Sequence, residues 1–297
     1  MTSKTSDKVF HILRAKILTI IAVAMLAPTV AFATAARQEN INAVNALANE
    51  SKRYNLSQLY FEGRGKELLF IGTNHTFTPG DPQIAGVEAF FKAFEPTLVL
   101  IEGGDWAIAD SKEQAVSKYG EMGFTRFLAA KANIKAMSAD APEGETIAAG
   151  LKEHTATDTK LYFALRVVPQ WAKQATGKTV EENMRDYLAS PKFNSYFPPN
   201  TLPQNIEELQ QQLAKRIPTL KDWKSFKYNW AFDGGDKSFL NEVDTTVNNF
   251  RNNYFKDQIF TGLRKGERVF VIAGYTHLGK IAPLFSQGLP AELMPSN

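Results

Sequence analysis

Two histidines follow strand-like apolar segments in the same short pattern. "IGTNH" ends at His75 and "AGYTH" ends at His277, so each histidine stands three residues after a glycine, in a chain with only four histidines. Two further apolar runs end in acidic residues, "PTLVLIEGG" with Glu102 and "IKAMSAD" with Asp140. Imidazole nitrogens and carboxylate oxygens are donors by which proteins bind divalent metal ions. If these side chains meet in space, they predict a metal site.

Such a site would hold Zn²⁺, Mn²⁺, Fe²⁺ or Co²⁺ through His75, Glu102 and His277, with one position open for water. A metal lowers the pKa of bound water to near neutrality, which is the basis of metal-assisted hydrolysis. Glu102 would then be a third ligand or a general base. Two alternatives stay open: histidines that are only hydrogen-bonded in place, and a metal-free hydrolase with His75 and Glu102 as acid and base.

An arginine lies on the apolar stripe of a long predicted helix. Val243, Val247, Phe255 and Ile259 share helical spacing with Arg251. An arginine on an otherwise apolar face needs a buried anionic partner. Arg251 is therefore predicted to hold a carboxylate or to stabilise an oxyanion in the transition state. The alternative is a side chain that extends along the edge of the stripe to solvent.

The elements around these residues predict an α/β fold, with a mainly parallel sheet flanked by helices. Short continuous apolar runs over 66–72, 96–104, 134–140 and 267–274 are typical of strands covered on both faces. Between the first two, residues 81–95 have Asp and then Pro at a helix start, followed by apolar residues at helical spacing. Parallel strands would bring all four candidate side chains to the carboxyl edge of one sheet, where open α/β sheets bind ligands.

The chain between the third strand and the last helix is predicted to be a helical insertion, from about 155 to 235. A mostly helical segment before the third strand has a break near Gly120. After the insertion, a long helix is expected from Asp236, as N-cap, to about Leu263, with Gly266 just beyond it. The aromatic residues near its start, Trp223 among them, are expected to pack the insertion onto the sheet.

The N-terminus has the layout of a secretory signal peptide. Basic residues precede the uncharged run "ILTIIAVAMLA", and small residues allow cleavage after Ala33. This predicts a leader over 1–33 and a single domain over 34–297, periplasmic or secreted. The protein would then contact a membrane only through this export signal. The alternative is an uncleaved helix that anchors the protein, since the uncharged segment has about the length that spans a bilayer.

Composition excludes several classes of function. Removing residues 1–33 leaves equal numbers of basic and acidic side chains, so the formal charge of +3 belongs to the leader and gives no support to a nucleic-acid partner. The absence of cysteine excludes disulfides, thiolate metal sites and a cysteine nucleophile. The P-loop, Gly-x-Ser-x-Gly and His-Glu-x-x-His motifs are also absent.

Four segments resemble the TraB/GumN/Tiki family: "GTNH", "LVLIEGG", "FRNNYFKDQI" and "VFVIAGYTHLGKI". The family belongs to a wider superfamily with erythromycin esterases and ChaN-like haem-binding proteins. The resemblance implies an active site of two Gly-x-x-His motifs, a glutamate and an arginine, here His75, Glu102, Arg251 and His277, with Asp140 as a further acidic residue. It also implies metal-dependent peptidase activity on a peptide or small-molecule substrate, with haem binding as the alternative. The sequence does not indicate an oligomeric state.

Overall fold

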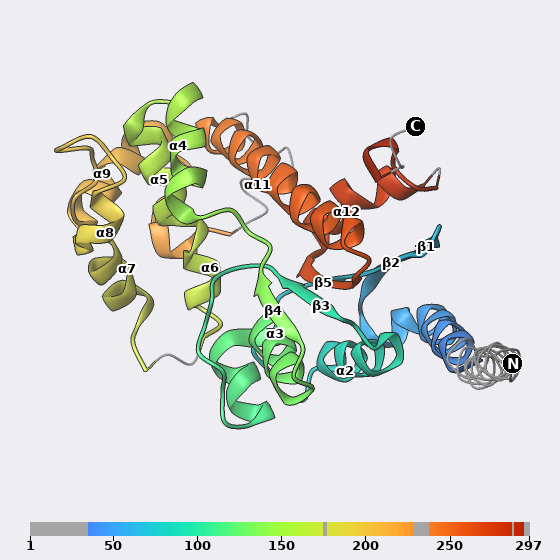
Figure 1. The fold of residues 1–297 in the computed structure, drawn as a ribbon. Coiled ribbons are helices and arrows are strands. Elements are labelled where there is room, and N and C mark those ends of the chain that lie inside the picture. The colour runs from blue at the N-terminus through green and yellow to red at the C-terminus, as the bar shows by residue number, and fades with distance from the viewer. Residues whose placement is uncertain (1–34, 175–176, 228–237, 287, 294–297) are drawn as a thin grey trace, which may run out of the picture.

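A computed structural model describes residues 35–174, 177–227, 238–286 and 288–293, and has an α/β fold. Its centre is a five-stranded sheet in the order β1-β2-β5-β3-β4 (Figure 1). The strands are β1 (Ser57–Gly63), β2 (Lys66–Thr73), β3 (Leu98–Ile101), β4 (Lys135–Ser138) and β5 (Arg268–Gly274). The last strand in the sequence therefore lies in the middle of the sheet.

Four of the strands run parallel, as the apolar runs predict. β5 pairs in parallel with both β2 and β3, and β3 pairs in parallel with β4. The first strand was not predicted from the sequence and pairs antiparallel with β2. The turn between them is Arg64-Gly65, with φ of 51° and 71°. Positive φ at both central residues matches the twist of a two-residue hairpin.

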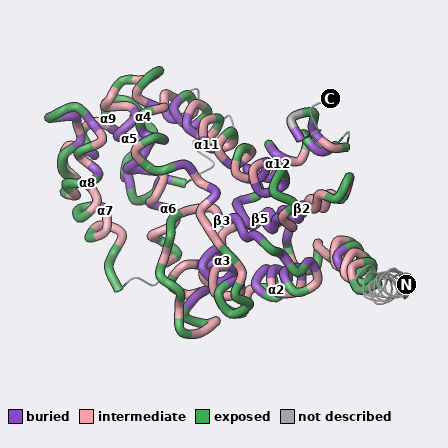
Figure 2. Tube along the Cα trace, in the orientation of Figure 1, coloured by how far each residue is buried: buried purple, intermediate pink, exposed green. Residues whose placement is uncertain are grey.

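Helices cover both faces of the sheet (Figure 1). On one face, α2 (Pro82–Phe94) and α3 (Lys112–Lys131) pack against β2, β3 and β5. On the other face lie the C-terminal half of α11 (Phe239–Arg264) and α12 (Tyr275–Ile281). The central strands are buried along their length (Figure 2). Coverage on both faces explains why their sequences are continuously apolar rather than alternating.

A second, helical region packs around the N-terminal half of α11. It contains α4 (Glu143–Glu153), α5 (Ala156–Arg166), α6 (Val168–Trp171), α7 (Val180–Ala189), α8 (Pro191–Asn194) and α9 (Ile206–Arg216). Between 155 and 235, the described residues form no strand. Trp223 and Phe226 are buried in this helical core. The two regions are joined by α11, which runs from one to the other (Figure 1).

The ends of the predicted elements differ slightly from the expectation. The long helix begins at Phe239 with Ser238 as N-cap, and Asp236, the predicted cap, lies outside the described residues. Gly266 follows the helix with a φ of 76°, as a C-terminal glycine does. The predicted leader, 1–33, also lies outside the described residues. Within the described chain, no helix combines the length and hydropathy needed to cross a membrane.

Candidate active site

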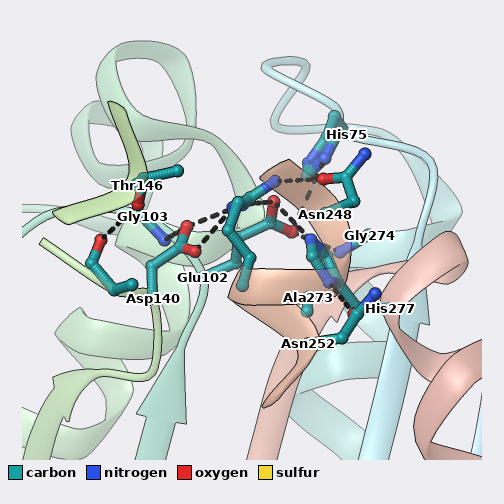
Figure 3. A network of polar contacts seen from close by, with 12 residues as sticks. His75, Glu102, Gly103, Asp140, Thr146, Asn248, Asn252, Ala273, Gly274 and His277 are labelled. Atoms are coloured by element: carbon teal, nitrogen blue, oxygen red, sulfur yellow. Dashed lines mark hydrogen bonds and ion pairs between the residues drawn. The ribbon is translucent and has the colours of Figure 1, made fainter. Parts of the chain in front are cut away.

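The four predicted side chains meet at the carboxyl edge of the sheet. His75 follows β2, Glu102 follows β3, Asp140 follows β4, and His277 lies on α12 directly after β5. Because β5 pairs with both β2 and β3, the two histidine segments and the glutamate come from three neighbouring strands. Figure 3 shows Glu102 between Asp140 on one side and the two imidazoles on the other.

Glu102 is the centre of this group. Its Oε1 lies 3.3 Å from His277 Nε2, and its Oε2 lies 3.8 Å from His75 Nε2. Oε1 also accepts a hydrogen bond from Arg251 Nη2 at 2.8 Å, and Oε2 accepts one from the backbone N–H of Gly274 at 2.6 Å. Both imidazoles therefore face the same, mostly covered carboxylate, whose side chain is 14% exposed.

The far nitrogen of each imidazole is fixed by a hydrogen-bond acceptor. His75 donates through Nδ1 to Glu121 Oε1 at 2.9 Å, and His277 donates through Nδ1 to Asn252 Oδ1 at 2.7 Å. A carboxylate and an amide oxygen only accept, so the Nδ1 atoms carry the protons. The His277 ring also stacks on Phe255, with centroids 4.7 Å apart. Both rings are thus held with Nε2 towards Glu102.

This arrangement favours a positive charge between His75 and Glu102. A neutral imidazole that donates through Nδ1 presents only a lone pair at Nε2, and two acceptors that face each other repel. Burial alone would lower the pKa of His75, but its hydrogen bond to Glu121 and the charges of Glu102 and Glu121 raise the pKa to about 9. The raised pKa means that His75 carries a proton on Nε2 at neutral pH, on the side of the ring that faces Glu102.

The charge of Glu102 is stabilised by its neighbours. Burial would raise the pKa of Glu102, but the charge and hydrogen bond of His277, then the charges of Arg251 and His75, bring it well below the ordinary value. The carboxylate therefore stays ionised at neutral pH. An ionised Glu102 is a metal ligand or an anchor for cationic imidazoles, and its low pKa makes it a weak proton acceptor.

Arg251 has the buried anionic partners that its position on the apolar stripe predicts. Its Nε and Nη2 donate to the two oxygens of Asp140, each at 2.7 Å, while Nη2 also donates to Glu102. The residue is 6% exposed, which excludes the alternative of a side chain extended to solvent. Its pKa is raised well above the ordinary value, since Asp140 and Glu102 outweigh the effect of burial. Arg251 thus orients Glu102, and Asp140 orients Arg251.

The glycines of the two motifs provide space for close packing, and neither has a positive φ. Gly274 has a φ of −55°, and a Cβ added there would lie 3.0 Å from His75 Nε2. A Cβ at Gly72 would lie 3.1 Å from the backbone Cα of Tyr275. The positive φ belongs to His75 itself, at 38°. The glycine of each motif therefore leaves room for a neighbouring group: the His75 ring next to Gly274, and the backbone of Tyr275 next to Gly72.

The sequence did not reveal Glu121. This carboxylate is 1% exposed and accepts from Thr73 Oγ1 as well as from His75 Nδ1 and the Thr76 N–H. It reaches His75 because α3 is kinked at Gly120, where φ is 68° and ψ is −164°. The predicted break at Gly120, directly before an acidic residue, was the one available signal. Asn252 was missed as well, although it is adjacent to Arg251.

The donor chemistry of the site suits a divalent metal. Two imidazoles with Nδ1 bound to a carboxylate or an amide oxygen have the outer-shell pattern of metal-binding histidines, and Glu102 supplies an ionised carboxylate. As the side chains stand, no group of three or more His, Asp or Glu residues within the described ranges is arranged to hold a metal ion. Binding through His75, Glu102 and His277 would require these side chains to adjust.

A cavity of about 250 Å³ opens beside the histidines and Glu102. Its remaining walls come from the loop after β2, the start of α12, α5, α6 with the turn after it, and α11, including Phe77, Tyr162, Lys173, Asn248 and Tyr275. The side chain of His75 is 33% exposed, whereas that of His277 is 4% exposed. His75 is thus the imidazole that a ligand in the cavity reaches more easily.

Comparisons with protein-family models, with curated proteins and with solved structures found no match.

Proposed function

We propose that this protein is a metal-dependent hydrolase of a peptide or ester bond. The observation that supports it is the convergence of His75 and His277 on Glu102, with each Nδ1 proton donated away from the shared point. Two Nε2 lone pairs and an ionised carboxylate that face one another are a donor set that a divalent metal prefers. The choice of peptide or ester bond comes from the resemblance to the TraB/GumN/Tiki family.

In this proposal His75, His277 and Glu102 hold the metal, which when bound supplies a hydroxide at neutral pH and polarises the carbonyl of the substrate. Glu121 and Asn252 keep the two rings in the tautomer that presents Nε2. Arg251 keeps Glu102 in place through the hydrogen bond from its Nη2. The apolar surfaces of Phe77 and Tyr275 orient the substrate.

Metal analysis of the purified protein tests the proposal. After incubation with Zn²⁺ or Mn²⁺ and removal of excess ion, wild type should retain one metal per chain and hydrolyse peptide or ester substrates. His75→Ala combined with His277→Ala should retain none and be inactive. His154→Ala is the matched control, because His154 is bonded to Thr246 and does not line the cavity. Full metal retention in the double variant would contradict the proposed site.

Experiments on the same purified protein distinguish two alternative functions. A haem-binding protein would give a Soret band on titration with haem, and His75→Ala would lose that band. Haem binding has less support, because both Nε2 atoms face Glu102 instead of pointing to a free ligand position. A metal-free hydrolase with His75 as acid and Glu102 as base would stay active in a chelator. The low pKa of Glu102 argues against it, because a weak base is a poor proton acceptor.

We also propose that residues 1–33 direct export to the periplasm or the exterior, as the sequence predicts. The arrangement of basic residues before an apolar run and a small-residue end supports it. N-terminal sequencing of protein from a secreting host should give a mature chain that begins at Thr34. Recovery of uncut chain in the membrane fraction would favour the anchored alternative.

A further inference from the structure

A second cavity of about 630 Å³ lies next to the one beside the histidines. It is lined by residues that follow β3 and β4, by α4 and by the helical region, among them Gly103, Ser138, Glu143 and Tyr187. Arg166, Gln170 and Arg251 line both cavities. The two cavities therefore adjoin along these three side chains.

The size of the first cavity limits what it accepts. At about 250 Å³ it is below the roughly 300–1,000 Å³ of sites that enclose whole drug-sized ligands. It suits a single small group of a longer substrate. Part of its wall is apolar, from Phe77, Tyr162 and Tyr275, and Tyr275 is 56% exposed at this wall.

The two cavities differ in charge. Around the first, three cationic side chains, Arg166, Lys173 and Arg251, face the single carboxylate of Glu102. Around the second, three cationic side chains are balanced by three carboxylates, those of Asp105, Asp140 and Glu143. A cleft lined by an excess of one sign attracts the opposite charge. The first cavity therefore favours an anionic group, and the second favours a neutral chain.

Lys173 is the cation that is available to bind such a group. Arg251 is already engaged by Asp140 and Glu102, whereas no described residue forms an ion pair with the Lys173 ammonium. Lys173 and His75 both line the first cavity. An anion held by Lys173 would thus lie close to the proposed reacting centre.

From this geometry we infer that the protein is a carboxypeptidase, an inference that rests on the proposed hydrolase function. The C-terminal residue of a peptide occupies the first cavity, with its carboxylate on Lys173 and its side chain against Phe77 and Tyr275. The preceding residues extend past Arg251 into the second cavity. Water oxygen bonds to the carbonyl carbon of the last peptide bond, the C–N bond breaks, and the nitrogen takes a proton and leaves as the amine of a free amino acid.

The test compares two peptides that differ only at the C-terminus, one with a free carboxylate and one with an amide. Full-length protein loaded with Zn²⁺ or Mn²⁺ is incubated with each, and products are identified by mass spectrometry. The free acid should lose its last residue with a kcat/KM about tenfold higher than the amide, the equivalent of about 1.4 kcal/mol. Lys173→Met should bring the acid-to-amide ratio close to one. Lys152→Met, an exposed lysine that lines neither cavity, should leave the ratio at the wild-type value.

The outcomes separate this inference from the function on which it rests. Hydrolysis of both peptides at equal rates, or cleavage only at internal bonds, overturns the carboxypeptidase and keeps the hydrolase. An unchanged ratio in Lys173→Met overturns the role of Lys173 in recognition. No hydrolysis of either peptide, nor of an ester substrate, by the metal-loaded protein overturns the hydrolase and the carboxypeptidase together.

Discussion

Replacing Glu121 with glutamine tests how the site is oriented, because this change keeps the shape of the side chain and removes its charge. Oε1 of Glu121 accepts from Thr73 Oγ1 and His75 Nδ1, and Oε2 accepts from the Thr76 N–H. A glutamine has one oxygen and one NH₂ group, so it cannot accept all three bonds. The consequence depends on which way the amide points.

If the amide oxygen takes the place of Oε1, the NH₂ group faces the Thr76 N–H and leaves it unsatisfied. A buried donor without a partner costs about 1–3 kcal/mol of stability. If the amide is reversed, its NH₂ donates to His75 Nδ1 and forces the proton onto Nε2, which then cannot bind a metal. Glu121→Gln should therefore lower the free energy of unfolding by about 2 kcal/mol or impose the wrong tautomer, and weaken metal binding by about 10- to 100-fold.

Urea denaturation of the metal-free protein measures the first effect, and titration calorimetry with Zn²⁺ measures the second. The control is Glu113→Gln on the same helix, since Glu113 is exposed and should change stability by less than about 0.5 kcal/mol. The reasoning is refuted if Glu121→Gln matches the control in both measurements. A loss of stability with unchanged affinity for Zn²⁺ would leave Glu121 a structural residue only.

Three further changes have defined outcomes. Gly274→Ala should reduce the rate of hydrolysis by about 10²-fold, because the new Cβ would lie 3.0 Å from His75 Nε2. Stability should fall little, since the backbone at this position has a φ of −55° that alanine also adopts. Wild-type kinetics in this variant would contradict the prediction. Arg251→Met should lower the free energy of unfolding, measured in urea, by about 3–5 kcal/mol. The same change should cost less in a protein that already has Asp140→Asn. If the losses of the two single variants add up to the loss of the double variant, the pair is not coupled. Burial lowers the pKa of Lys160 to about 8, so the unfolded chain binds more protons above that pH and stability should rise between pH 8 and 9.5, by at most about 1.4 kcal/mol per pH unit. Lys160→Met should remove this rise. The assignment is refuted if urea denaturation gives the same pH dependence of the free energy of unfolding in wild type and in the variant.

The parallel strands and the location of the site could be predicted because both depend on short local patterns. Continuous apolar runs indicate strands that are covered on both faces, and residues after parallel strands gather at one edge. This was enough to bring His75, Glu102 and His277 together. The apolar stripe around Arg251 likewise indicated a buried anion, and the structure provides two.

Other features depend on tertiary packing and have weak local signals. β1 is mostly half-buried and mixes polar with apolar residues, so its segment does not stand out from the chain around it. Glu121 reaches the site only because α3 kinks at Gly120 and turns a carboxylate towards β2. The strand order is set by which faces pack together, and no local pattern placed β5 between β2 and β3.

The central location of β5 has a consequence for biosynthesis. β2 and β3 do not pair with each other, because β5 lies between them, and β5 is translated about 170 residues after β3. Until that strand inserts, Glu102 lacks the Gly274 amide and His277, and His75 has no partner ring opposite it. A chain that stops before β5 and α12 therefore cannot bring His75, Glu102 and His277 together.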